Sequence, residues 1–355
     1  RDDVESRGLG DVYKRQLCYN IERVFHRRSF MIREKVLYEL EINRGKQISG
    51  GMLAKKLGVS RAAIWKAISS LRDEGMNITS VTGGGYCLTN DDDTINEQSI
   101  HALRKTKVIG SSLIVLPEVT STNTILKNEY SHKDEGFTVI STRQTAGKGR
   151  MGRSFTSPDG GVYTSILLKP NMPLENLSFL TILAAVAACI TIENCTDLKP
   201  QIKWVNDVLF DKKKLCGILT EASIEGETGN IDYVVVGIGI NVRTDISKMP
   251  KELQNIAGSI SDFCENPPRR AEIAATLLNV FEECYNILCS EDGEDKILKL
   301  YDDRLCCKNE TVEVYTASEH YNAICKGVNS AGNLIVQKED GTLTILQAGE
   351  IRIKV

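Results

Sequence analysis

The sequence predicts an α+β protein with an N-terminal helix-turn-helix segment, a central segment of mixed helices and strands, and a short all-β tail. Apolar residues at helical spacing give way to a hairpin pattern before residue 90. Strand patterns then follow one another between residues 137 and 242, and short strands with turn signals fill residues 305–355. Because several consecutive strands lack intervening helices, a doubly wound parallel sheet is disfavoured.

Composition limits the class of protein. The chain has 355 residues, 41% apolar and 26% charged, with a formal net charge of −3, which indicates two or three globular domains. Eleven cysteines without a C-x-x-C motif and only four histidines indicate reduced thiols, no zinc and no bound redox cofactor. The longest apolar run, residues 179–192, is shorter than a membrane span. We therefore expect a core helix there, in a cytoplasmic protein without a membrane partner.

Residues 1–30 lack an initiating Met and any apolar periodicity, so we expect a non-native translated leader with Met31 as the native start. Residues 31–93 are expected to form a winged helix-turn-helix domain. Apolar residues lie on one face of the first helix, Ser60 is a candidate N-cap for the third, and residues 77–89 would form the wing. The expected core positions of these helices are Val36, Leu37, Leu40, Leu53, Leu57, Ile64, Ile68 and Leu71.

The third helix of this domain carries cations away from its apolar face, as a helix in a DNA major groove would. Two interpretations remain open, because winged helices also serve as protein docking domains. Trp65 is expected to pack in the core rather than contact a base. The candidate DNA-binding residues are Ser60, Arg61, Lys66 and Arg72.

A charged linker at residues 90–94 leads into the central segment, residues 94–304. Strands are expected at 137–144, 160–170, 201–210, 214–225 and 231–242, and helices at 175–194 and 269–290. Residues 305–355 are expected to form a small β-barrel. With so few residues its own core would be marginal, so it should lean on the central segment.

Polar residues gather at four places in the central segment. Ser121, Thr122 and Asn123 begin a helical pattern, where one of them would be an N-cap, although three neutral residues in a row also suit an uncharged polar ligand. Residues 143–154, "RQTAGKGRMGRS", combine cations with glycines. A linker, a nucleic-acid patch and an anion-binding loop all fit that composition, but a position between two strands and the neutral Gln144 favour the anion-binding loop.

The other two places lie on later strands. Lys214 directly precedes an apolar strand, which would hold its charge against a ligand anion. Asn206 and Asp207 fit a hairpin turn best, while Asp207 is also a candidate Mg²⁺ ligand. In "VVVGIGINV" Gly237 and Gly239 permit close approach of a ligand, and no third glycine or helix follows as a dinucleotide site requires.

In order along the chain, "STN", "QTAGKGRMGR", "KWVND", "KLCGIL" and "GIGIN" resemble the motifs of a biotin protein ligase of the bifunctional bacterial type, which also represses biotin synthesis. The resemblance runs from Met31 to the C-terminus. It implies a winged helix, then a class II synthetase-like mixed α/β catalytic domain over residues 94–304, then an SH3-like barrel. Related alternatives are a lipoate-type protein ligase and a transcription factor whose central domain only senses a ligand.

The resemblance implies that biotin and MgATP form biotinyl-5'-AMP and pyrophosphate, and that a Lys of a biotin carboxyl carrier domain then attacks the acyl carbon. It also implies a homodimer on operator DNA upstream of biotin genes. The catalytic residues would be Lys148, Arg150 and Lys214, with Asp207 placing Mg²⁺. The biotin site would comprise Ser121, Thr122, Asn123, Gln144, Gly147, Lys148, Gly149, Arg150, Lys214, Gly217, Leu219, Gly237 and Gly239. The adenylate site would comprise Arg150, Arg153, Phe155, Asn206 and Asn241.

The sequence departs from the family's usual "GRGRRGR" and "KWPND" at Lys148, Met151 and Val205. Lys148 keeps its charge but lacks the bidentate fork of Arg, and Met151 removes a cation. We expect altered ligand affinity or adenylate retention rather than a different reaction. Val205 removes the fixed φ of a proline and leaves the turn geometry open.

Overall fold

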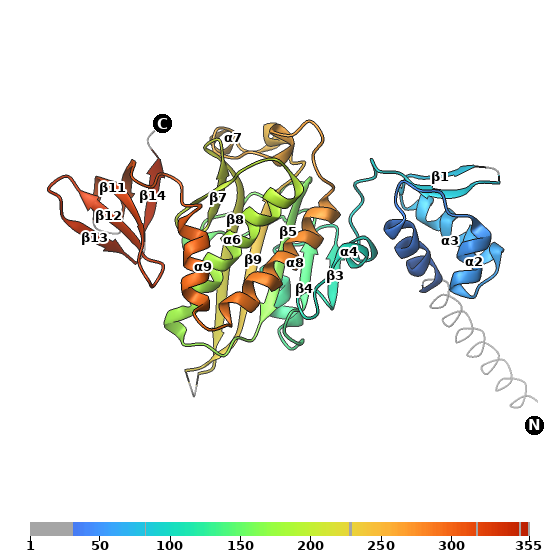
Figure 1. Ribbon diagram of the computed structural model, residues 1–355, viewed down its shortest axis with the longest axis horizontal. Coiled ribbons are helices and arrows are strands. Elements are labelled where there is room, and N and C mark those ends of the chain that lie inside the picture. The colour runs from blue at the N-terminus through green and yellow to red at the C-terminus, as the bar shows by residue number, and fades with distance from the viewer. Residues whose placement is uncertain (1–30, 82, 227–228, 317–318, 348, 354–355) are drawn as a thin grey trace, which may run out of the picture. The chain divides into compact units, whose positions relative to one another are not determined.

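The computed structural model describes residues 31–81, 83–226, 229–316, 319–347 and 349–353, so the expected leader at 1–30 lies outside the described residues. The chain divides into two compact units, the first ending at Ala102 and the second running from Leu103 to Val355 (Figure 1). The predicted α+β fold is confirmed. Helix α4 (Glu97–Leu103) lies at the division, whereas the predicted boundaries at residues 93 and 304 stay predictions.

The first unit is a winged helix-turn-helix. A helix across residues 31–42 is followed by α2 (Gly50–Leu57), α3 (Arg61–Asp73) and the wing strands β1 (Ile78–Val81) and β2 (Gly85–Leu88). Ser60 is the N-cap of α3, where its hydroxyl accepts a hydrogen bond from the Ala63 amide at 3.2 Å. The wing closes back on the turn before α2, because Ile48 pairs with Tyr86. Every predicted core residue is buried except the partly buried Leu57.

The prediction that Trp65 packs in the core is wrong. Its side chain is 60% exposed on α3, because the inward face of that helix is completed by Ile64, Ala67, Ile68 and Leu71, all buried. Trp65 therefore lies on the outward face with Arg61 and Lys66. The sequence pattern could not separate the two placements, since a tryptophan at the edge of an apolar stripe fits either.

A seven-stranded sheet with strand order β3-β4-β5-β9-β8-β7-β6 forms the centre of the second unit. Only β3 and β4 pair in parallel; the other neighbours are antiparallel. The strands are β3 (Leu113–Leu116), β4 (Thr138–Ser141), β5 (Gly161–Leu168), β6 (Gln201–Lys203), β7 (Asp207–Phe210), β8 (Lys213–Ile224) and β9 (Ile231–Asn241). The single strand expected at 201–210 is thus two strands joined by a turn at residues 204–206.

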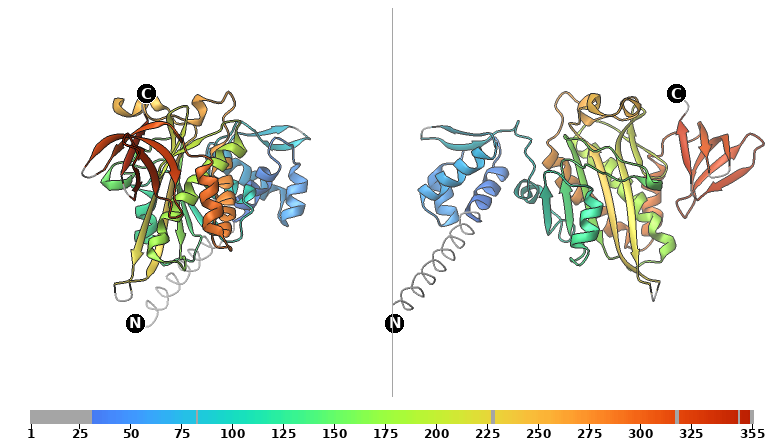
Figure 2. Two further views of the ribbon diagram at one scale, coloured as in Figure 1. Left: turned by 60° about the vertical axis from the view of Figure 1, so that its left-hand side comes forward. Right: turned by 180° about the vertical axis from the view of Figure 1, so that it is seen from behind.

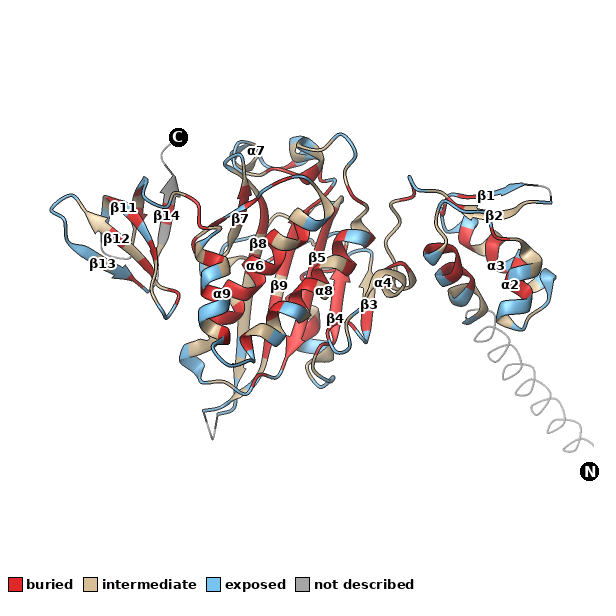
Figure 3. Cartoon of the chain, in the orientation of Figure 1, coloured by how far each residue is buried: buried red, intermediate tan, exposed pale blue. Residues whose placement is uncertain are grey.

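Three helices cover one face of this sheet (Figures 1 and 2). They are α6 (Ser178–Cys195), α8 (Arg270–Leu288) and α9 (Gly293–Asp302), of which α9 was not among the predicted elements. The apolar stretch that contains α6 is long enough to cross a membrane by length and composition, but most of it is buried within the protein (Figure 3). Consistent with the prediction, α6 is a core helix between the sheet and its helical neighbours.

Short elements lie between these strands and helices. Helix α5 (Thr122–Ile125) continues into a π-helical turn, Leu126–Tyr130, before β4. The remaining short elements are the 3₁₀ turns Arg150–Gly152, Leu174–Leu177, Ile246–Lys248 and Ile260–Asp262, and helix α7 (Lys251–Gln254).

The tail forms an antiparallel sheet of order β13-β12-β11-β10-β14, with turns at the two predicted positions. Its strands are β10 (Thr311–Tyr315), β11 (His320–Val328), β12 (Leu334–Lys338), β13 (Leu343–Leu346) and β14 (Glu350–Ile353). As expected, it leans on the central sheet: the Trp204 indole donates to the Gly332 carbonyl at 3.1 Å, and Leu305 bridges to Ile202.

Candidate functional site

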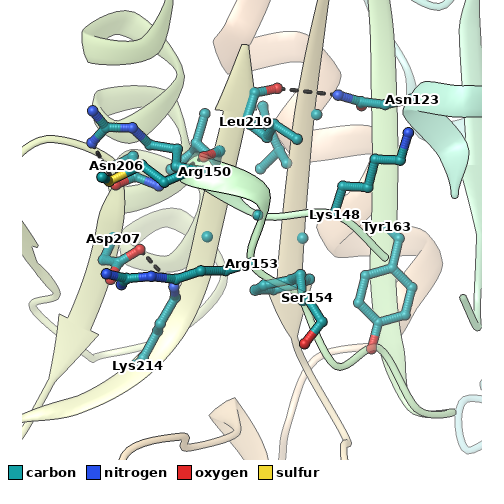
Figure 4. Close-up of a pocket in the computed structure, with 18 of the residues that line it drawn as sticks. Asn123, Lys148, Arg150, Arg153, Ser154, Tyr163, Asn206, Asp207, Lys214 and Leu219 are labelled. Atoms are coloured by element: carbon teal, nitrogen blue, oxygen red, sulfur yellow. Dashed lines mark hydrogen bonds and ion pairs between the residues drawn. The ribbon is translucent and has the colours of Figure 1, made fainter. Parts of the chain in front are cut away.

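One pocket brings together most of the polar residues singled out in the sequence (Figure 4). It is built from the start of α5, the loop between β4 and β5, the turn before β7, and the middle of β8 and β9. All the predicted biotin-site, adenylate-site and metal residues line it except Gly147 and Asn241. Predicted residues separated by as much as 118 positions, Ser121 and Gly239, thus meet at one place.

The loop from Arg143 to Gly160 forms one wall of the pocket. Isolated bridges join Gln144 to Ser157 and Lys148 to Ser154, so the loop folds back on itself like a distorted hairpin. Gly147 lies behind this wall, where an added Cβ would come within 2.3 Å of the Phe155 carbonyl oxygen. The fold therefore requires glycine at 147 for close backbone packing, and its predicted contact with biotin remains a prediction.

Two of the three departures from the family motifs, Met151 and Val205, lie at unusual backbone positions. Met151 has a φ of 56°, in the left-handed region, and its side chain is 78% exposed at the pocket mouth. Val205 follows a cis peptide bond with Trp204, and the next residue, Asn206, donates its side-chain amide to the Ile218 carbonyl at 2.9 Å.

Neutral hydrogen-bonding groups gather at one end of the pocket. Ser121 is the N-cap residue of α5, as expected for one of the three residues, but its side chain makes no capping hydrogen bond. The Gln144 side chain takes that role instead: its Oε1 accepts from the Thr122 amide at 2.8 Å, and its Nε2 donates to the Ser157 hydroxyl at 2.8 Å. Gln144 thereby ties the loop wall to the start of α5.

Cations and one carboxylate gather at the other end. The Lys214 ammonium lies 2.6 Å from Asp207 Oδ1, and the side chains are 25% and 21% exposed. Arg150 donates to Asn206 Oδ1 at 3.3 Å, and Arg153 reaches across toward Asp207 (Figure 4). The backbone of Lys214 is held by bonds to Ile256 and Gly258, which fixes where its charge emerges. The pocket therefore has a cationic end and an end rich in neutral groups, and the Lys148 side chain points toward Asn123 at the latter (Figure 4).

The floor between the two ends is made of glycine. Gly217 on β8 pairs directly with Gly239 on β9, and the Phe155 ring lies over both: an added Cβ would come within 2.8 Å of the ring at Gly217 and 2.6 Å at Gly239. The Lys214 ammonium lies 5.5 Å from the centre of the same ring, within cation–π range. The Phe155 ring thus covers Gly217 and Gly239 and lies beside Lys214.

Asn241 lies outside the pocket lining. Its side chain is 4% exposed, and its amide donates to the Gly258 carbonyl at 3.0 Å. Its Oδ1 is buried without a partner. Asn241 therefore anchors the segment after α7 to the end of β9, and its predicted adenylate contact remains a prediction.

Within the part of the chain that the structure describes, no group of three or more His, Cys, Asp or Glu residues could hold a metal ion. Asp207 is a single carboxylate at the cationic end. A lone carboxylate fits Mg²⁺ that takes its remaining ligands from substrate phosphates and water, which is how this ion binds in many nucleotide sites.

The outward face of α3 in the first unit is the candidate nucleic-acid interface. Arg61, Trp65 and Lys66 are exposed on it. Ser60 is at its start, although its hydroxyl is engaged in capping. Arg72, at the far end of α3, donates its Nε to the Ile78 carbonyl at 2.8 Å, so it links the helix to the wing.

Fold and site together define a class of protein in which a winged helix-turn-helix precedes a domain of the protein-ligase type. The family model "Biotin/lipoate A/B protein ligase family" matches residues 115–241, and a helix-turn-helix model matches residues 32–87. The bifunctional ligase/repressor BirA of Bacillus subtilis is 34% identical over 317 residues, which cover 88% of this chain and 97% of the relative. The Escherichia coli protein of the same name is 28% identical over 86% of this chain and 92% of its own length.

A solved biotin protein ligase from Aquifex aeolicus, in complex with biotin and ATP, superposes with a TM-score of 0.59 at 27% identity. That match covers 68% of this chain and 98% of the Aquifex chain. The chain belongs to the family of the bifunctional ligase/repressors.

Proposed function

We propose that this protein is an ATP-dependent biotin–protein ligase. The observation that carries the proposal is one pocket that has neutral amide and hydroxyl groups at one end and Arg150 and Lys214 at the other, with Lys148 also in its lining. Biotin has the matching form, a neutral ureido ring joined through an alkyl chain to a carboxylate. The named function of the relatives and the ligands of the Aquifex structure support the same substrates.

In the first step a carboxylate oxygen of biotin attacks the α-phosphorus of ATP. A carboxylate–phosphorus bond forms, the bond to the β-phosphate oxygen breaks, and pyrophosphate leaves. Two anions must meet for this to happen, and fixed cations at Lys148, Arg150 and Lys214 would offset their repulsion. Mg²⁺ held by Asp207 and the substrate phosphates would neutralise the charge that builds up on the leaving pyrophosphate.

In the second step the amine of a carrier-domain Lys attacks the acyl carbon of biotinyl-5'-AMP, and AMP leaves. Neither step requires a covalent bond to the enzyme. The mixed anhydride hydrolyses readily in water, so a loop that orders over it, such as residues 143–160, would protect it. The Phe155 ring, displaced from the glycine floor, would then lie over the adenylate.

The test of this function is ATP–pyrophosphate exchange by the wild-type protein. We expect exchange that depends on biotin and not on lipoate, followed by transfer of labelled biotin to a carrier domain. If ATP–pyrophosphate exchange responds to lipoate and not to biotin, the protein is a lipoate-type protein ligase. If the protein binds biotin but shows neither exchange nor transfer, it is a ligand-sensing transcription factor without ligase activity.

We also propose that the first unit binds operator DNA upstream of biotin genes and that the protein acts as a biotin-responsive repressor. The basic, exposed face of α3 supports this role, as does the repressor function named for the relatives. A homodimer would place two such helices on one operator, as two-fold symmetric repressors require. Free thiols at all the cysteines that the structure describes fit a reducing, cytoplasmic location.

Trp65→Ala is expected to weaken binding to the biotin-gene upstream fragment about tenfold while leaving binding to random DNA unchanged, because an exposed apolar ring on a recognition helix suits the thymine methyl group. Lys66→Ala should instead weaken both and flatten the salt dependence, as loss of a phosphate contact does. The measurement is a DNA titration at several salt concentrations. Met52→Ala, which removes another exposed apolar side chain of this unit, is the control. Equal affinity of Trp65→Ala and wild type for the upstream fragment would exclude the base contact.

A further inference from the structure

A chain of hydrogen-bonded side chains runs behind the neutral end of the pocket. Lys127 Nζ lies 2.5 Å from Glu221 Oε1, and Glu221 Oε2 accepts from the Asn123 amide Nδ2 at 2.8 Å. The Ser165 hydroxyl lies 2.6 Å from Asn123 Oδ1 and 2.7 Å from the Thr122 hydroxyl. Neither Lys127, Glu221 nor Ser165 was among the residues predicted from the sequence, and none of them lines the pocket.

The inner residues of this hydrogen-bonded series are buried. Ser165 is fully buried, Asn123 is 3% exposed and Thr122 is 4% exposed. Asn123 is held on a second side by the Leu219 carbonyl, which accepts from its Nδ2 at 3.3 Å (Figure 4). Buried polar groups that lose a partner are costly. The orientation of each group therefore depends on that of its neighbour.

The number of protons that each group can donate determines the direction of every hydrogen bond in this series. A carboxylate only accepts, so Glu221 turns the NH₂ group of Asn123 toward itself and the amide oxygen toward Ser165. That oxygen also only accepts, so Ser165 donates its single proton to Asn123. Ser165 must then accept the proton of Thr122. Thr122 Oγ1 is left with lone pairs to offer a ligand, because its other contact, Gln144 Oε1, is longer at 3.2 Å.

We propose that Glu221, anchored by Lys127, is a positioning residue that makes the Thr122 hydroxyl a hydrogen-bond acceptor for a ureido N–H of the ligand. This inference rests on the proposed function and adds to it the residue that sets the polarity of the neutral end. It requires an ionised Glu221. Burial raises the pKa of this carboxyl, but hydrogen bonds from Lys127 and Asn123 together hold its pKa below the ordinary value.

The first test is Glu221→Gln in biotin-dependent ATP–pyrophosphate exchange. Glutamine keeps the shape of the glutamate side chain but can present an N–H to Asn123 or to Lys127. The donor-to-acceptor order of the hydrogen bonds from Glu221 to Thr122 is then no longer determined. We expect KM for biotin to rise about tenfold, with kcat and KM for ATP within about twofold of wild type. Asp232→Asn, an exposed charge removal on the neighbouring strand β9, is the control and should match wild type.

The second test is a double-mutant cycle with Thr122→Val, which keeps the branched shape and removes the hydroxyl. If Glu221 acts through that hydroxyl, the double variant should lose little more than Thr122→Val alone. Two independent effects would instead multiply to about a hundredfold, and that result would overturn the inference.

Lys127→Met, which removes only the anchor, should give a smaller rise of about threefold in KM for biotin, and it replaces Glu221→Gln in the cycle if the latter is unfolded at the assay temperature.

A merely structural role for Glu221 gives a different pattern. It would lower Tm and change kcat and both KM values together, and it would show no coupling to Thr122. A biotin KM within twofold of wild type in folded Glu221→Gln would also reject the inference, while leaving the proposed function intact. The proposed function fails separately, in the wild-type protein, if exchange does not respond to biotin.

Discussion

Replacing Lys214 with Ala is expected to lower the rate of biotin-dependent ATP–pyrophosphate exchange by a factor of about 10² to 10³. The ammonium is held at the cationic end of the pocket by the paired strand start and by the ion pair with Asp207 at 2.6 Å. Because its backbone is anchored on the sheet rather than on the loop, its position costs no reorganisation when charge develops on the reacting phosphate. The effect should fall mainly on kcat.

Lys213→Ala is the matched control. It removes a neighbouring cation whose ammonium donates to the Asn255 carbonyl at 2.7 Å, outside the pocket lining. Exchange in this control should stay within about twofold of wild type, since a surface charge contributes little. Thermal unfolding of Lys214→Ala should show a folded protein, because Asp207 is still partly exposed. A folded Lys214→Ala variant with wild-type exchange would remove this residue from the reaction.

Gly239→Ala is expected to raise KM for biotin by about 10²-fold, since displacement of reacting groups by about 1 Å has effects of this size. The added methyl group would meet the Phe155 ring at 2.6 Å and the Tyr163 ring at 3.2 Å. Tyr163 is 1% exposed and cannot move aside. The methyl group would therefore project from the floor and block the passage between the neutral and cationic ends.

Gly226→Ala is the control for this substitution, because an added Cβ there has no neighbour within 4 Å. The measurement is biotin binding by calorimetry together with exchange kinetics. Binding of biotin to folded Gly239→Ala with wild-type affinity would show that the ligand does not cross the glycine floor.

The two ends of the pocket differ in how far the sequence reveals them. The cationic residues follow from local signals, since Lys148 and Arg150 lie among glycines between two strands and Lys214 precedes an apolar strand, but only the structure shows that Lys148 points toward Asn123 (Figure 4). The sequence reveals only part of the neutral end. Gln144 and Thr122 are prominent in their motifs, but Glu221 and Ser165 are single polar residues within strands, where nothing in the neighbouring sequence distinguishes them from ordinary polar positions.

By itself the sequence determined the class of each segment, because apolar periodicity, caps and turns act over a few neighbouring residues. It placed the core face of α3, the core helix α6 and the turns of the tail, all of which the structure confirms. It also determined which motifs carry charge. The tertiary structure alone decided which of these residues meet. The β8–β9 register pairs Gly217 with Gly239, the fold sends Trp65 outward and Asn241 away from the pocket, and it brings Lys127 to Glu221 across 94 positions. Such contacts depend on which strands pair and on packing between distant segments, and local periodicity does not specify either.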